Sequence, residues 1–199
     1  MPLSEGFDQA LLFASDLHRD QIRKGANIPY MSHLLSVAAL VIECGGNEKQ
    51  AIAGLLHDTL EDCSEQFGGG KALAAVIEER FGADVRRMVE GCTDAEAIPK
   101  PPWQERKNAY LSAIPSKAGD TLLVACCDKL HNARCILHDL EELGPAVFDR
   151  FSSSVEQTLW YYQSLAKAFQ DALGSNARSA RLLAGTVAQI VKLSEADPR

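Results

Sequence analysis

Apolar residues recur at helical spacing in one segment of this chain after another, and no segment shows the apolar–polar alternation of a strand. In the first such segment, Phe7, Leu11, Leu12, Ala14 and Leu17 follow a helical period. Glycines and prolines separate the segments and mark turns between helices. The pattern predicts an all-α fold. We expect helices over residues 4–23, 32–44, 47–62, 71–81, 83–90, 103–113, 120–143, 153–173 and 175–193. Ser32 and Asn47 are expected to cap the second and third of these helices.

Length and composition predict one globular domain covering residues 1–199, with enough chain to bury a substantial core. Hydrophobic residues make up 46% and charged residues 24%, which is ordinary for a globular protein. The longest apolar run, residues 34–42, is too short to span a membrane. The first residues lack the basic region and apolar stretch of a secretory signal, so we expect a cytoplasmic protein without membrane partners.

The net charge of −7 argues against nucleic-acid binding, which requires a basic surface, but it leaves room for a local basic pocket around a small anion. The six cysteines include no Cys-x-x-Cys pair, so zinc-finger spacing is absent. Cys126 and Cys127 lie in an apolar run and are predicted to be buried thiols. The composition does not determine the oligomeric state, and a homo-oligomer is one of the alternatives.

A cluster of chemically active side chains follows the apolar residues 51–56: His57 and Asp58, then Glu61 and Asp62. On a continuous helix, Glu61 would lie one turn above His57, and Asp62 one turn above Asp58. An imidazole and a carboxylate together suit divalent manganese, iron or zinc. A metal-activated water can attack phosphorus, and a nearby carboxylate can take its proton. Alternatively, acidic side chains on a helix simply face solvent, although charges after a buried segment need partners.

Several segments taken together extend this pattern beyond the cluster. They are residues 18–25 (HRDQIRKG), 29–38 (PYMSHLLSVA), 55–62 (LLHDTLED), 81–85 (FGADV), 89–94 (VEGCTD), 105–107 (ERK) and 128–134 (DKLHNAR). In this order they resemble the HD-domain superfamily. More closely, they resemble the hydrolase domain of bifunctional RelA/SpoT-type enzymes and the stand-alone small alarmone hydrolases. The resemblance implies a single HD-type helical bundle.

The resemblance also implies a site for one divalent ion, usually Mn²⁺, held by His33, His57, Asp58 and Asp128. Fe²⁺, Zn²⁺ and Co²⁺ also tolerate such a ligand set. Of the remaining histidines, two fall at positions that the family does not use as ligands, and the third, His138, has no partner motif. We interpret these three residues as structural or as supports for the ligands: His18, His131 and His138.

In the resembled family, Glu61 and Asp62 correspond to the pair that positions and deprotonates the attacking water. The implied reaction removes the 3′-pyrophosphate from guanosine tetra- or pentaphosphate and gives GDP or GTP. The partner is therefore a small guanine nucleotide.

Other positions correspond to contacts with the nucleotide. Arg23 and Lys24 correspond to a basic pair along the base, and Asn132 to a ribose or phosphate contact. Lys107, together with Arg106, is placed to neutralise phosphates. Without the resemblance, each basic cluster is either a substrate contact or a solvated face.

Two other functions remain open. A related HD phosphatase would act on another nucleotide, such as the 2′-phosphate of NADPH, and would release phosphate rather than pyrophosphate. An inactive HD module would bind nucleotide as a sensor, although it would not need Glu61 and Asp62. The proline-containing residues 94–102 are expected to form a loop at the rim of the phosphate site. Residues 159–162 are aromatic or apolar and form either a pocket wall or core packing.

Overall fold

The computed structural model describes residues 2–93 and 101–196. Within these ranges all regular structure is helical apart from one isolated bridge between Ile22 and Pro29, so the all-α prediction is confirmed. None of the helices in the described ranges has both the length and the apolar character needed to cross a membrane. The elements are α1 (Glu5–Leu17), α2 (Met31–Glu43), α3 (Glu48–Leu56), α4 (Thr59–Asp62), η1 (Ser64–Phe67), α5 (Gly70–Phe81), α6 (Ala83–Cys92), α7 (Trp103–Ala113), η2 (Ile114–Ser116), α8 (Gly119–Leu143), η3 (Gly144–Arg150), α9 (Val155–Leu173) and α10 (Arg178–Ala196).

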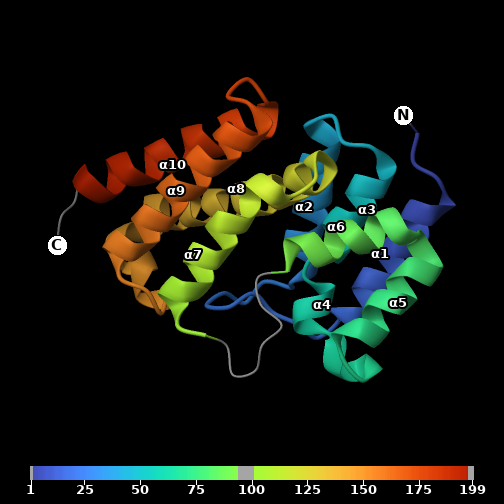
Figure 1. The fold of residues 1–199 in the computed structure, drawn as a ribbon. Helices are drawn as coiled ribbons and strands as arrows, with labels where there is room; N and C mark the ends of the chain where they lie inside the picture. The colour runs from blue at the N-terminus through green and yellow to red at the C-terminus, as the bar shows by residue number, and fades with distance from the viewer. Residues whose placement is uncertain (1, 94–100, 197–199) are drawn as a thin grey trace.

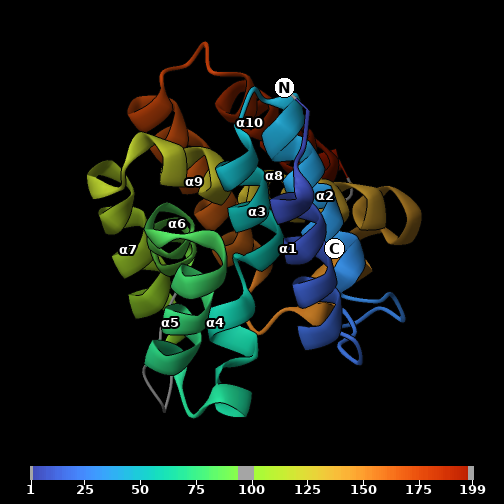
Figure 2. The ribbon, with the colours of Figure 1, turned by 90° about the vertical axis from the view of Figure 1, so that its right-hand side faces the viewer.

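The long helix α8 is the central element of the bundle (Figures 1 and 2). Helices α9 and α10 pack on it from one side, and α2, α3 and α6 pack on it from the other. Both buried cysteines expected in the core, Cys126 and Cys127, lie on α8 and have no solvent exposure. Because α8 contacts both groups of helices, side chains on it can meet residues that are far apart in the chain.

Local signals in the sequence explain where several helices begin. Asn47 and Gln50 form a reciprocal capping box at the start of α3, as the sequence predicts for Asn47. Ser154 and Gln157 form a second capping box at the start of α9. Gly82, with a φ of 88°, separates α5 from α6, because a left-handed backbone favours glycine.

A glycine also sets how closely α3 approaches α2. A Cβ atom added to Gly54 would lie 3.2 Å from the Cα and 3.3 Å from the amide nitrogen of Ala38. Any side chain at this position would push the two backbones apart. The contact matters because α2 carries His33, and α3 ends immediately before His57.

The predicted C-terminal end of the first helix is wrong. The helix ends at Leu17 rather than at residue 23. The chain then folds back on itself, with the Tyr30 amide donating to the Gln21 carbonyl and the Arg23 amide donating to the Ile28 carbonyl. These backbone pairs replace helical hydrogen bonds. Tyr30, rather than Ser32, is the residue that precedes the next helix.

The predicted helix over residues 47–62 is also interrupted, and the interruption lies at His57 and Asp58. The His57 ring donates from Nδ1 to the Gly54 carbonyl oxygen at 2.8 Å, and so uses an acceptor in the last turn of α3. A side chain that inserts into the helical ladder is a known cause of such breaks. Our picture of Glu61 one continuous turn above His57 is therefore incorrect.

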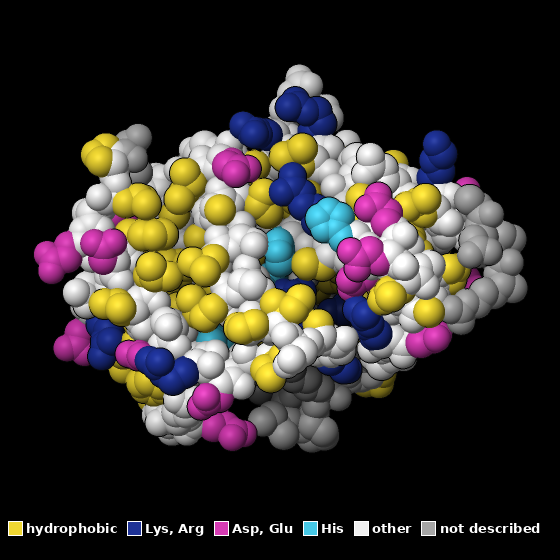
Figure 3. All heavy atoms as spheres, turned by 180° about the vertical axis from the view of Figure 1, so that it is seen from behind, with side chains coloured by type: hydrophobic (Ala, Val, Ile, Leu, Met, Phe, Trp, Pro, Cys, Tyr) yellow, Lys and Arg dark blue, Asp and Glu magenta, His cyan; other side chains and the backbone are white. Residues whose placement is uncertain are grey.

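Exposed hydrophobic side chains occur on α1 and α2 and include Leu12, Leu35 and Ile42. In the view of Figure 3, hydrophobic side chains crowd one half of the molecular face. Patches of this kind often mark interfaces, and homo-oligomer formation stays a prediction. Residues 94–100 of the predicted rim loop lie outside the described residues.

Candidate metal centre

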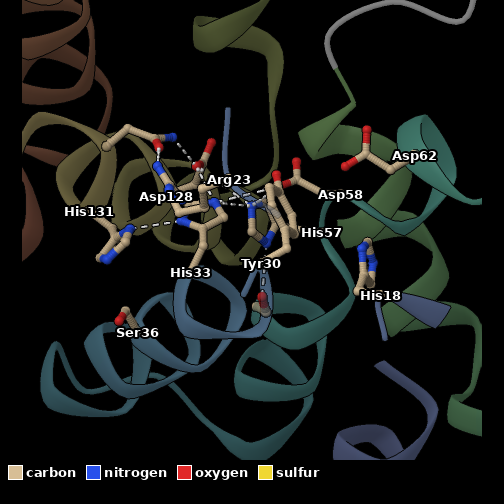
Figure 4. Close-up of polar contacts among 12 residues, drawn as sticks. His18, Arg23, Tyr30, His33, Ser36, His57, Asp58, Asp62, Asp128 and His131 are labelled. Carbon is tan, nitrogen blue, oxygen red and sulfur yellow. Dashed lines mark hydrogen bonds and ion pairs between the residues drawn. The ribbon is translucent and has the colours of Figure 1, made fainter. Parts of the chain in front are cut away.

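Four parts of the chain bring the four predicted metal ligands to one point (Figure 4). His33 comes from α2, His57 ends α3, Asp58 precedes α4 and Asp128 lies on α8. The Nε2 atoms of His33 and His57 lie 3.2 Å apart. Asp58 Oδ2 lies 3.4 Å from His33 Nε2 and 3.0 Å from His57 Nε2. Asp128 Oδ1 lies 3.3 Å and 3.6 Å from the same two nitrogens.

These spacings fit a single bound cation. Two ligand atoms about 2.1 Å from one ion and separated by roughly 90° to 110° lie about 3.0 to 3.4 Å from each other. His33, His57 and Asp58 each place a ligand atom within 4.8 Å of the others, and Asp128 meets both rings from α8. Two imidazoles and two carboxylates suit Mn, Fe, Zn or Co.

Each ligand histidine has its second ring nitrogen engaged, and this orients Nε2 toward the centre. His57 Nδ1 donates to the Gly54 carbonyl oxygen. His33 Nδ1 lies 2.7 Å from Nδ1 of His131. Burial, His33 and Arg23 lower the pKa of His131 to about 3, so this ring is neutral and accepts the proton of His33 Nδ1. Such partners fix the tautomer of a ligand histidine.

The carboxylate ligands are held in the same way. The Tyr30 hydroxyl donates to Asp58 Oδ2 at 2.6 Å. Asn132 Nδ2 donates to Asp128 Oδ1 at 2.6 Å, and Lys129 Nζ lies 2.7 Å from Asp128 Oδ2. Sequence analysis assigned no role to Tyr30 or Lys129, although both fall in the segments that carry the resemblance.

The electrostatics favour ionised carboxylates in a buried place. Burial alone would raise the pKa of Asp58, but His57 and His33 outweigh it and hold the pKa well below its usual range. Burial opposes ionisation of Asp128 too, and there Lys129 and His33 lower the pKa. Burial would lower the pKa of His57, whereas the two carboxylates raise it. The cluster therefore attracts positive charge, as a metal site must.

The predicted catalytic pair lies beside this cluster. Glu61 and Asp62, on α4, line the same cavity of about 320 Å³ as His33, Asp58 and Asp128. Burial raises the pKa of Asp62. The structure thus brings the pair and three of the predicted ligands to one cavity.

A short hydrogen-bonded chain holds Asp62 in place. Gln21 Nε2 donates to Asp62 Oδ2 at 2.8 Å. The amide oxygen of Gln21 in turn accepts from Nδ1 of His18 at 2.5 Å. His18 is buried and stacks on Tyr30 with ring centroids 5.4 Å apart. Sequence analysis did not predict this role for Gln21, because it depends on contact between residues that are 41 positions apart.

The predicted substrate contacts divide into two groups. Arg23, Lys24 and Asn132 line the metal cavity, and Arg23 Nη2 donates to Asn132 Oδ1 at 3.0 Å. Lys107 does not line it. It lies instead on a neighbouring cavity of about 240 Å³, with its Nζ 5.0 Å from the centroid of the Tyr161 ring. Lys129 lines the metal cavity together with Lys24.

The aromatic segment after η3 serves both purposes considered for it. Tyr161 is buried in the core. Tyr162 lines two cavities next to the metal site. Trp160 is part-exposed, with its ring centroid 6.3 Å from that of Trp103. Phe151, which sequence analysis did not single out, lines the metal cavity and both of its neighbours.

Comparison with known proteins identifies the family. The model of the HD-domain family matches residues 10–167. The chain belongs to the HD-domain family, as the resemblance implied. Among curated relatives, guanosine-3′,5′-bis(diphosphate) 3′-pyrophosphohydrolase MESH1 of Xenopus tropicalis is 33% identical over 171 residues, covering 84% of this chain and 85% of the relative.

A bacterial relative and a solved structure agree with this result. Guanosine-3′,5′-bis(diphosphate) 3′-pyrophosphohydrolase of Aquifex aeolicus is 34% identical over 135 residues, covering 67% of this chain and 18% of that protein. The structure of a metazoan orthologue of SpoT that hydrolyses ppGpp matches with a TM-score of 0.72 at 26% identity. That match covers 97% of this chain and 99% of the other.

Proposed function

We propose that this protein is a metal-dependent hydrolase that removes the 3′-pyrophosphate from guanosine tetraphosphate (ppGpp) or pentaphosphate. The observation that carries the proposal is the meeting of two histidines and two aspartates next to a second pair of carboxylates in one cavity. The names of the relatives in Xenopus tropicalis and Aquifex aeolicus support the choice of substrate.

We propose His33, His57, Asp58 and Asp128 as the residues that hold the ion, with Mn²⁺ as the first choice and Fe²⁺, Zn²⁺ and Co²⁺ as alternatives. When bound there, such an ion supplies Lewis-acid chemistry that polarises a phosphoryl group. A cytoplasmic location would fit this reaction.

Glu61 and Asp62 position the attacking water and take its proton as the new phosphorus–oxygen bond forms. Gln21 keeps the Asp62 carboxylate turned toward the cavity. Burial raises the pKa of Asp62, which makes its carboxylate a stronger base than an exposed aspartate. The bond between phosphorus and the 3′ oxygen of the ribose breaks, and that oxygen is protonated to give the free hydroxyl of GDP.

Basic and amide groups around the cavity stabilise the phosphates. Lys129 lies beside Asp128, and Arg23 and Lys24 line the same cavity. Asn132 is placed between Asp128 and Arg23, because it donates to the first and accepts from the second. We propose that Asn132 contacts the ribose or a phosphate and that Lys107 acts on phosphates that extend into the neighbouring cavity.

The first experiment is product analysis with purified protein, Mn²⁺ and ppGpp, with separation of GDP, pyrophosphate and free phosphate. The expected result is equal amounts of GDP and pyrophosphate, which a chelator abolishes and added metal restores. Release of free phosphate, or turnover of NADPH but not ppGpp, would replace this function with that of a nucleotide phosphatase. Metal binding without turnover of either would indicate an inactive binding module.

A further inference from the structure

A second and larger cavity adjoins the metal site. It has a volume of about 520 Å³. Arg23, Lys24, Asn132 and Phe151 line both this cavity and the metal cavity, so the two spaces meet at these side chains. A substrate whose phosphates lie at the metal has this cavity available for the rest of the molecule.

Helix α8 runs from one cavity to the other. Asp128, Asn132, Cys135 and Asp139 follow one another at intervals of four, three and four residues, so they share one face of the helix. The last three line the larger cavity. Asp139 lies eleven residues after Asp128, which corresponds to about 16 Å along the helix axis. This length is comparable with a nucleoside 3′-phosphate plus its contacts at the two ends.

Asp139 is held in a defined position at the far end. Arg150 Nη1 lies 2.7 Å from Asp139 Oδ2, and both side chains are part-exposed. Arg150 is also packed against the turn at Gly25, where an added Cβ would lie 3.1 Å from Arg150 Cδ. Gly25 has a φ of 76°, so both its backbone and the available space favour glycine. The Arg150 contact uses one carboxylate oxygen, and a carboxylate has a second oxygen that can accept hydrogen bonds.

The chemistry of Asp139 selects among purine bases. An ionised carboxylate only accepts hydrogen bonds. The Watson–Crick edge of guanine carries two neighbouring donors, N1–H and the N2 amino group, whereas adenine presents the acceptor N1 at the same place. We propose that Asp139, held by Arg150, accepts hydrogen bonds from the Watson–Crick edge of a guanine base bound in the larger cavity. This proposal rests on the proposed function, because it places the phosphates of the same nucleotide at the metal site.

The test compares binding of GDP and ADP by calorimetry in the presence of Mn²⁺, which needs no turnover. The variants are Asp139→Asn and, as the matched control, Asp171→Asn, which removes a carboxylate from the exposed ion pair with Lys167 on α9. The wild type and the control are expected to prefer GDP. Asp139→Asn should weaken GDP binding about 10- to 100-fold, because a hydrogen bond to a charged group is lost. The asparagine amide can donate to N1 of adenine and accept from its N6 amino group, so ADP binding should hold or improve.

Two results would overturn the proposal: equal binding of GDP and ADP by the wild type, or an unchanged preference for GDP in Asp139→Asn. In the second case Asp139 would only fix Arg150. A part-exposed ion pair contributes little to stability, so the variant should fold, and its thermal unfolding can be followed by circular dichroism. Failure of the proposed function would instead appear as the absence of pyrophosphate release from ppGpp by the wild type.

Discussion

The metal cavity and the larger cavity beside it are built in different ways. The metal cavity takes its ligands from packed helices, and His33, His57 and Asp128 are 1%, 1% and 5% exposed. The larger cavity is walled partly by the turn after α1 and by the segment around Phe151, which is 38% exposed. Positions on surface loops tolerate change far better than positions in a packed core. We therefore expect substitutions to be tolerated less well at the metal ligands than at the exposed walls of the larger cavity.

Removal of a ligand should have the largest effect. His57→Ala takes away one of the four proposed ligands and one ionic partner of both Asp58 and Asp128, so both metal content and turnover should be lost. Metal analysis of the purified protein measures the first, and pyrophosphate release from ppGpp the second. His138→Ala is the matched control for metal content, because His138 lines the larger cavity and is not among the residues around the metal cavity. Full metal content in His57→Ala would contradict the assigned ligands.

Removal of the catalytic pair should separate chemistry from metal binding. In the double variant Glu61→Ala with Asp62→Ala, kcat should fall by about 10²- to 10⁴-fold, the usual contribution of general acid–base groups. Metal content should stay near normal, because the cluster of His33, His57 and Asp58 is intact. A double variant that keeps its rate would show that the water is activated by other groups.

A smaller effect is expected from the residue that holds Asp62. Gln21→Ala removes the donor to Asp62 Oδ2, and loss of such a supporting partner costs about 10- to 100-fold in activity. The loss should appear in kcat with little change in KM, because Gln21 orients the reacting carboxylate. Steady-state kinetics with ppGpp measure both, and Gln163→Ala on the exposed side of α9 serves as control. A rise in KM alone would place Gln21 in substrate binding instead.

The smallest effect should come from the larger cavity. Phe151→Ala removes an aromatic surface at the meeting point of the three cavities, and an aromatic contact is worth about 0.5 to 1.5 kcal/mol. We expect a rise of about 2- to 12-fold in KM with kcat unchanged. Leu12→Ala, an exposed apolar change on α1, is the control. A fall in kcat as large as that of Gln21→Ala would mean that both cavities take part in the chemistry.

Sequence reasoning succeeded where a local signal carries the structure. The cap at Asn47 and the all-α class follow from residue types and spacing. The prediction failed where hydrogen bonds outside the regular helical pattern decide the structure. The break at His57 depends on a ring that reaches the Gly54 carbonyl, and the end of α1 at Leu17 depends on backbone pairing further along the chain.

The candidate site shows the same division. The ligand positions could be named from motifs, because a resemblance transfers residue by residue. For His131 the sequence predicted only a structural or supporting role. Its contact with His33 could not be predicted, because the two residues are 98 positions apart in the chain. Lys107 was predicted to neutralise phosphates and lies on the neighbouring cavity, whereas Lys129, which follows the ligand Asp128 on α8 and received no role from the sequence, lines the metal cavity.

The close contact at Gly54 has a consequence for how the protein acquires its ion. Because α2 and α3 touch backbone to backbone there, helix packing already brings His33 and His57 together. An ion that binds between them would meet ligands on elements that are packed in advance, so filling the centre would not require the two helices to dock around it.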